Sequence, residues 1–385
     1  MAAINLKDLY TKYEGFYSPV ARVYLAGENI EENKKLGVTI IDYLVEITSD
    51  LKAGIASFSV LNAYDLRSGG FRTKALKKYI ALGVDVKILM GHGASITEVF
   101  KGYIARVDFI YDSDEVEDAV LRITAMDIKG IMMANNSSKR LKANYYSDAV
   151  KEILDQATYQ NLKNNGVIDS INISATPDKP QGGAGAGGET PDIRIEMVAE
   201  SDYDFIVKAA KKFNFEFFTI GGNVTFRKAK ANTQELAEIT PSDMIISYNV
   251  GYDITGLVGS VVVRTLDVGK ASKIETKKKN AGKISLGNKA KPLISGQSYV
   301  YIDSTIETKN DADKRAEYLL EDMSYRLGHI SMTLRGMPEF VPGRFVKLKG
   351  FGDAVSNKYY ITDVIHEFNH GGAYYTTIEG KASTL

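Results

Sequence analysis

The chain has 385 residues, more than one hydrophobic core normally sustains, so we expect at least two domains. Its composition, 44% hydrophobic and 25% charged, excludes intrinsic disorder. The 48 basic residues balance 48 acidic ones, which argues against sequence-specific binding of nucleic acid. The absence of cysteine excludes disulfide scaffolds, thiolate metal sites and cysteine nucleophiles. We find neither a secretory signal nor an apolar run of about 18 residues, so we expect no stable membrane insertion.

Alternating apolar and polar residues predict that most of the fold is β. In the segment 330–335, for example, Ile330, Met332 and Leu334 share one face of a strand, and polar side chains occupy the other. The expected strands, in chain order, lie at residues 38–47, 56–61, 85–90, 103–110, 119–125, 193–197, 224–227, 260–264, 298–302, 330–335, 345–349, 359–365 and 374–379.

Helical periodicity is confined to four segments. Ser201 and Asp204 form a shorter version of a capping box at the start of one of these helices. Asn310 is the expected N-cap of the clearest helix, and Gly328 ends it. The expected helices lie at residues 73–82, 147–157, 201–213 and 310–327.

Two polar segments interrupt these elements. Residues 177–191 contain a run of Gly and Ala between prolines, which offers no side chain to pack, so we predict a mobile glycine-rich loop. Residues 269–283 carry six lysines, and we interpret them as an exposed loop or hairpin tip.

A weak internal repeat is visible along the chain. The segments that contain Gly83, Ile104 and Ile123 are similar in sequence to the segments that contain Gly343, Ile361 and Ile378. The spacings between these residues along the chain are nearly the same in both sets. Chance similarity between two glycine-led β-meanders remains an alternative to duplication.

One segment matches a zinc-peptidase motif. His366, Glu367 and His370 fit H-E-x-x-H, which binds zinc when a helix sets both imidazoles on one face. The preceding residues are aromatic and β-branched, and glycines follow, so a strand is expected here instead. On a strand, positions four apart lie about 13 Å apart, too far to share one metal ion.

Other motifs also favour a structural interpretation. Residues 183–188 fit G-x-G-x-x-G, but prolines flank them where a dinucleotide site needs a strand and a helix. The acidic residues 112–118 lack the glycine of a calcium loop. No Ser/His/Asp grouping is suggested, so we predict no catalytic, cofactor-binding or metal-binding residue and no enzyme.

The C-terminal region contains a motif, which we expect to be structural, whose residues include Pro342, Gly343, Gly350, His366 and Tyr375. With this motif the region resembles the baseplate hub of contractile phage tails, the late control protein D family, which is related to the N-terminal part of type VI secretion spike proteins. Segments 99–127 and 201–226 are similar to the first barrel and the mid-chain helix and hairpin of that family.

The resemblance implies a β-rich α+β protein in which two similar barrel-like tube domains carry smaller α/β insertions. The first tube domain is expected at residues 1–138. Residues 139–239 would form a helical and α/β insertion that contains the glycine-rich loop. Residues 240–385 would form the second tube domain, with the lysine-rich loop.

The resemblance further implies a homotrimeric ring that joins the hexameric tail tube to a separate spike protein and contacts tape-measure and baseplate wedge proteins. Such a particle is assembled in the bacterial host cytoplasm and belongs to a bacteriophage, a tailocin or another contractile injection system. A receptor- or carbohydrate-binding tail module and the hub of a non-contractile tail remain alternatives, with a zinc metallopeptidase more remote.

Overall fold

The computed structural model describes residues 3–111, 119–177, 195–242, 244–267, 272–280, 288–303, 306, 308–369 and 371–385. Strands account for 44% and helices for 21%, which confirms the β-rich α+β class. No helix among the described residues is both long and apolar enough to cross a membrane.

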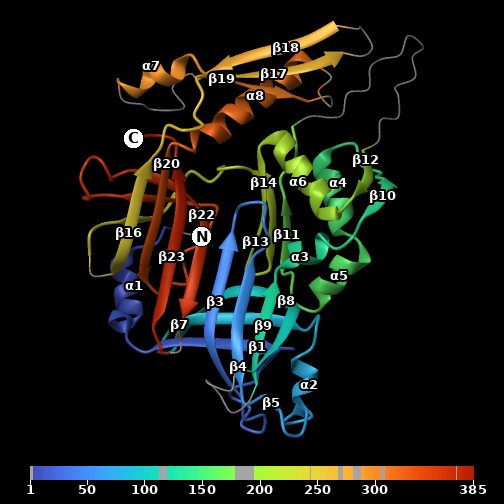
Figure 1. Ribbon diagram of the computed structural model, residues 1–385, viewed down its shortest axis with the longest axis vertical. Coiled ribbons are helices and arrows are strands. Elements are labelled where there is room, and N and C mark those ends of the chain that lie inside the picture. Colours follow the sequence, from blue (N-terminus) through green and yellow to red (C-terminus); the bar gives the residue numbers. More distant parts are fainter. Residues whose placement is uncertain are drawn as a thin grey trace.

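Thirteen strands form one strongly curved sheet at the centre of the molecule (Figure 1). Eleven follow the order β16-β20-β23-β22-β3-β4-β9-β8-β7-β1-β2, while β21 adds to β22 and β15 adds to β21. Their bounds are β1 Pro19–Leu25, β2 Glu28–Asn29, β3 Thr39–Thr48, β4 Ile55–Leu61, β7 Asp85–His92, β8 Ser95–Ile110, β9 Val120–Met126, β15 Glu235–Ile239, β16 Ile245–Tyr252, β20 Gly328–Arg335, β21 Phe345–Leu348, β22 Lys358–Phe368 and β23 Tyr374–Ala382.

The sheet contains the same five-stranded antiparallel unit twice. The first repeat is β3-β4-β9-β8-β7, and the second repeat is β16-β20-β23-β22-β21. The flanks differ, because β7 continues antiparallel to β1 whereas β21 continues parallel to β15.

The hydrogen bonds of the two repeats coincide in register. Gly83 N–H donates to the Ile104 carbonyl at 2.8 Å, and Gly343 N–H donates to the Ile361 carbonyl at 2.9 Å. Both glycines have positive φ, 84° and 78°, which an L side chain seldom adopts. In each repeat the register then shifts directly after the isoleucine. The predicted correspondence of Gly83 with Gly343 and of Ile104 with Ile361 is therefore confirmed.

The correspondence continues across the sheet. Ala125 pairs with Ile104 and Ala56, just as Gly380 pairs with Ile361 and Ile330. Val45 then pairs with Ala56 as Val250 pairs with Ile330. One register therefore relates all five strands, which chance similarity of two meanders would not produce.

Each repeat covers its own hydrophobic core. Phe58, Ile88 and Leu121 belong to the first core, and Met332, Val346 and Ile378 belong to the second. The predicted pair of similar barrel-like units agrees with this arrangement, while the exact domain boundaries remain a prediction.

An inserted unit follows the first repeat and lies on the right in Figure 1. Its helices pack on the sheets β10-β12 and β11-β14-β13, with Phe205, Phe217 and Phe226 in the core. The bounds are α3 Ile128–Met132, β10 Ser137–Arg140, α4 Tyr146–Leu154, α5 Ala157–Asn164, β11 Ser170–Ile173, β12 Glu196–Glu200, α6 Asp202–Phe213, β13 Phe215–Ile220 and β14 Asn223–Lys228.

A second unit is inserted between β16 and β20 and lies at the top of Figure 1. It comprises the sheet β18-β17-β19, on which Ala316 and Leu320 of α8 bury Val261 and Val263. The bounds are β17 Ser260–Asp267, β18 Ser272–Lys279, α7 Ala290–Ser295, β19 Ser298–Ile302 and α8 Lys309–Ser324. Smaller elements elsewhere are α1 Leu6–Lys12, the 3₁₀ turn Glu14–Phe16, α2 Leu76–Tyr79, β5 Tyr64–Asp65 and β6 Gly70–Phe71.

The interpretation of the lysine-rich segment as a loop is wrong for its central part. Residues 272–279 form β18, in which Ile274 and Thr276 face inward while Lys273 and Lys277 are exposed. Lysine is compatible with the solvent face of a strand, so its abundance hid the alternation. Residues 268–271 and 281–287 lie outside the described residues, as does the predicted glycine-rich loop apart from Pro177.

Three helix predictions also need correction. The helix expected at 73–82 is the single turn α2, and α8 ends at Ser324, so Gly328 begins β20 and does not end the helix. Thr308, not Asn310, caps α8, because the Thr308 hydroxyl accepts from the Asp311 amide at 3.1 Å. The helix expected at 147–157 ends at Leu154, and a separate helix follows it. The capping box of Ser201 and Asp204 is confirmed.

A buried ion pair begins α3 at the edge of the first repeat. Asp127 accepts the amides of Lys129 and Gly54, both at 2.9 Å, and its carboxylate lies 3.7 Å from the Lys129 ammonium. The Lys129 side chain is inaccessible to solvent and the Asp127 side chain is only 4% exposed. Burial raises the pKa of Asp127 and lowers the pKa of Lys129.

We predict that Asp127→Ala lowers the free energy of unfolding by about 3–5 kcal/mol, because it removes a helix cap and leaves the Lys129 charge buried alone. Lys129→Met is the matched comparison and should cost less, because the Asp127 carboxylate loses its opposite charge but keeps both amide hydrogen bonds. Urea unfolding of the two variants measures the difference. An equal loss in both would mean that the ion pair itself is a major source of stability.

Candidate assembly interface

The two repeats are joined by direct strand pairing. The second half of β22 runs antiparallel to β3, from Asp363 opposite Thr48 to Phe368 opposite Tyr43. The Lys52 ammonium lies 3.0 Å from Asp363 and binds Glu46 as well, so an ion-pair group flanks one end of the contact. An aromatic pair lies at the other end, where the Tyr43 and Phe368 rings meet edge to face at 5.8 Å.

The interior of this junction contains a fully buried histidine. His366 has no exposed surface, and its Nδ1 lies 3.0 Å from the Tyr374 hydroxyl and 3.1 Å from the Thr376 hydroxyl. Thr376 in turn accepts the Met337 amide at 2.8 Å. Burial disfavours the charged imidazolium and lowers the pKa of His366 to about 3.

A second histidine ties the N-terminal segment to both repeats. The His92 ring packs against Tyr13, Phe16 and Tyr374, with centroid distances of 5.0, 5.3 and 5.6 Å. Its Nε2 lies 2.8 Å from the Gly336 carbonyl. Desolvation lowers the pKa of His92 as well.

The predicted family-motif residues do not gather into one site. Pro342 and Gly343 are buried before β21, and a Cβ at Gly343 would lie 3.0 Å from the Arg227 guanidinium, which donates to the Gly343 carbonyl. Gly350 follows β21 with φ 82°. Tyr375 lies on β23 opposite Arg335 and Glu367. Their arrangement supports the fold of the second repeat.

The H-E-x-x-H segment is extended where it is described. His366 and Glu367 belong to β22, as predicted, and His370 lies outside the described residues. Among the described residues no cluster of three or more His, Asp and Glu side chains is suited to hold a metal ion.

Within the described part of the sheet, β8 and β16 each have an open edge. Pairing between β7 and β8 ends at Tyr103, so from Arg106 to Ile110 the strand β8 pairs with β9 alone. The strand β16 pairs with β20 alone. The two strands lie on opposite sides of the view in Figure 1. Sequence patterning placed β8 but missed β16, and it gave no indication of either open edge.

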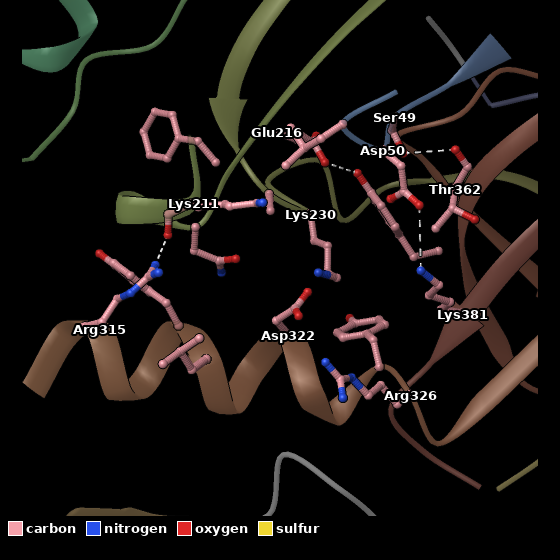
Figure 2. A pocket seen from close by; sticks show the side chains of 18 of the residues that line it. Ser49, Asp50, Lys211, Glu216, Lys230, Arg315, Asp322, Arg326, Thr362 and Lys381 are labelled. Carbon is pink, nitrogen blue, oxygen red and sulfur yellow. Dashed lines mark hydrogen bonds and ion pairs between the residues drawn. The ribbon is translucent and has the colours of Figure 1, made fainter. Parts of the chain in front are cut away.

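A cavity of about 690 Å³ lies where α8, β13 and the second repeat meet (Figure 2). The Arg315 guanidinium donates to the Lys211 carbonyl across it and stacks 5.0 Å from the Tyr301 ring centroid. On the other wall Lys381 and Asp50 lie 3.8 Å apart. The first contact joins the two inserted units and the second joins the two repeats, so the cavity lies where these parts of the chain meet.

Comparison with solved structures shows which proteins have this fold. A tail protein of Neisseria meningitidis superposes with a TM-score of 0.65 at 12% identity, over 95% of this chain and 97% of that chain. The 43 kDa tail protein of prophage MuSo2 from Shewanella oneidensis gives 0.64 at 12% identity, over 94% and 98%. An Escherichia coli component of the type VI secretion system gives 0.54 at 10% identity, over 93% and 76%.

The sequence comparisons are less informative. A search of curated proteins gives no significant match. A family model described as the Alg8 N-terminal domain matches residues 188–370, less than half of the chain. That range separates β22 from its hairpin partner β23 and omits the first repeat, so it does not coincide with a folding unit. The relation to tail proteins, predicted from sequence motifs, is thus confirmed at the level of the fold.

We predict that acid destabilises the junction through His366. Because its folded pKa of about 3 lies below the value of about 6.5 in an unfolded chain, the unfolded state binds the proton more tightly. Stability is therefore lost as the pH falls from about 6.5 towards 3, by about 2 kcal/mol at pH 5.

Thermal unfolding at pH 7.5 and pH 5 measures this loss. His366→Gln should reduce the difference between the melting temperatures at the two pH values, although it lowers the melting temperature at both. His329→Gln, at an exposed histidine, is the control and should leave the pH dependence unchanged. An unaltered pH dependence in His366→Gln would contradict the assignment.

Proposed function

We propose that this chain is the structural baseplate hub of a contractile tail, in which three copies form a ring that joins the hexameric tail tube to the central spike. The fold shared with tail proteins over nearly the full length of both chains supports a structural role in a tail. The observation that carries the ring is the five-stranded unit that occurs twice in one chain in the same register.

The repeat supports this role through symmetry. Three copies of a chain with two equivalent units present six similar units, so a ring of three can make matched contacts with a hexameric tube. A hub of this kind requires packing surfaces and no catalysis, and we propose that the chain is not an enzyme. Its partners would be the tube, the spike, the tape-measure protein and the baseplate wedge, in a phage, a tailocin or another injection particle.

We expect purified protein to form a particle of three times the 42.3 kDa chain mass. Sedimentation velocity over a wide concentration range measures the mass, and negative-stain images of the particle should show six similar lobes around an opening. A persistent monomer, or a closed assembly of another subunit number, would contradict the ring.

A binding assay separates this role from that of a receptor- or carbohydrate-binding module. A hub should bind tube and spike proteins encoded beside it and should not bind bacterial envelopes or glycans. Saturable binding of the isolated protein to envelopes would favour the receptor-binding alternative instead.

A further inference from the structure

We propose that the open half of β8 in one copy pairs antiparallel with the open edge of β16 in the next copy, in the register of the β3–β22 contact within the chain. This inference rests on the proposed ring and specifies the contact that holds it together. The partner is a second copy of this chain.

The internal junction is the template for this contact. In it, the first repeat supplies the edge of β3, and the second repeat supplies the half of β22 that extends beyond β21. The register that the two repeats share makes β16 the counterpart of β3. It also makes the half of β8 that extends beyond β7 the counterpart of the half of β22 that extends beyond β21. The chain therefore uses one of two equivalent edge pairs internally and leaves the other pair open.

The register of the proposed contact follows from the equivalent residues. Val250 corresponds to Val45, and Phe109 corresponds to His366, which pairs with Val45. Phe109 is therefore expected opposite Val250 of the next copy. The full set of expected pairs is Arg106 with Asp253, Val107 with Tyr252, Asp108 with Gly251, Phe109 with Val250, Ile110 with Asn249 and Tyr111 with Tyr248.

Exposed apolar side chains mark both edges. Phe109, Ile110 and Tyr111 are 53%, 40% and 54% exposed, and Ile246 and Tyr248 on the other edge are 51% and 49% exposed. A long open strand edge with apolar side chains is a site at which another strand adds, and folded proteins normally cover or blunt it. Pairing of the two edges would cover both.

The ends of the contact repeat the chemistry of the internal junction. Tyr111 and Tyr248 occupy the positions of Phe368 and Tyr43, which pack edge to face within the chain. At the opposite end, the Arg106 side chain is 72% exposed and binds Asp108 at 2.8 Å within the chain, and it would also face the exposed Asp253 of the next copy. Opposite charges directly across an antiparallel pair stabilise it, so the signs of the two charges fit.

The contact is heterologous, since different surfaces of the two copies meet. Such contacts close into a ring only when the rotation from copy to copy is a whole fraction of a turn. Each copy then gives one edge and receives one edge, so the open edges of β8 and β16 are both covered.

Cysteine pairing tests the register directly, because the chain contains no cysteine. In the double variants Phe109→Cys/Val250→Cys and Ile110→Cys/Asn249→Cys, the paired Cα atoms would lie about 4.5–5.5 Å apart, within the range of a disulfide. Mild oxidation should convert each variant to covalent trimers that survive denaturing gels without reductant and collapse to monomers with it.

Two matched control variants test whether cross-linking depends on the predicted register and position. Ile110→Cys/Ile246→Cys shifts one partner by about three residues, roughly 10 Å, and should not cross-link. Val198→Cys/Asn249→Cys places one cysteine on the exposed strand β12 of the inserted unit and should not cross-link either.

The outcomes separate this inference from the proposed function. A particle of three chains in which neither predicted pair cross-links would overturn the edge pairing and leave the ring standing. A monomeric wild-type protein would overturn the ring itself. As a test without mutations, hydrogen exchange of the wild-type trimer should be slow at residues 106–110 and 248–252, and rapid exchange at both segments would count against the pairing.

Discussion

The antiparallel contact between β3 and β22 is the interaction on which the remainder of the structure depends. It converts two five-stranded units into one continuous sheet and buries His366 between them. The N-terminal aromatic residues Tyr13 and Phe16 then pack over the seam, against His92 and through it against Tyr374. With the two repeats fixed in this way, the inserted units attach to a rigid support.

The inserted units are anchored by polar contacts as well as by packing. The Arg227 guanidinium binds Glu216 at 2.6 Å within the first unit and the Gly343 carbonyl of the second repeat at 2.7 Å. Glu216 also accepts the Tyr360 hydroxyl of β22, and burial raises the pKa of this carboxyl group. One partly buried arginine and one buried glutamate therefore join the first inserted unit to two segments of the second repeat. Since each unit has its own core, their mutual orientation depends on such joints more than on a common interior.

The repeated strands could be predicted from the sequence because their residue pattern is local. Gly83 and Gly343 need positive φ, and alternation around Ile104 and Ile361 follows from burial on one face. Sequence reasoning missed β16 although Ser247, Asn249 and Gly251 alternate there with apolar residues, which is the pattern of a strand, on an edge that is exposed on much of its length. The open edges could not be predicted from one sequence at all. Whether Phe109 is covered depends on which strand lies beside it, and that is a property of the whole sheet.

The difference between His366 and Phe109 has a consequence for how such a chain evolves. The two residues occupy equivalent positions, yet one lies in a contact within the chain and the other at an edge that meets a separate molecule in our proposal. A tethered partner is present at a high effective concentration, so the internal seam can tolerate the cost of burying an imidazole. A contact between separate molecules must repay the entropy of association, which favours a large apolar side chain instead. After a duplication, covalent linkage therefore relaxes selection on the side chains of the β3–β22 contact within the chain. Selection then acts more strongly on the proposed β8–β16 contact between copies.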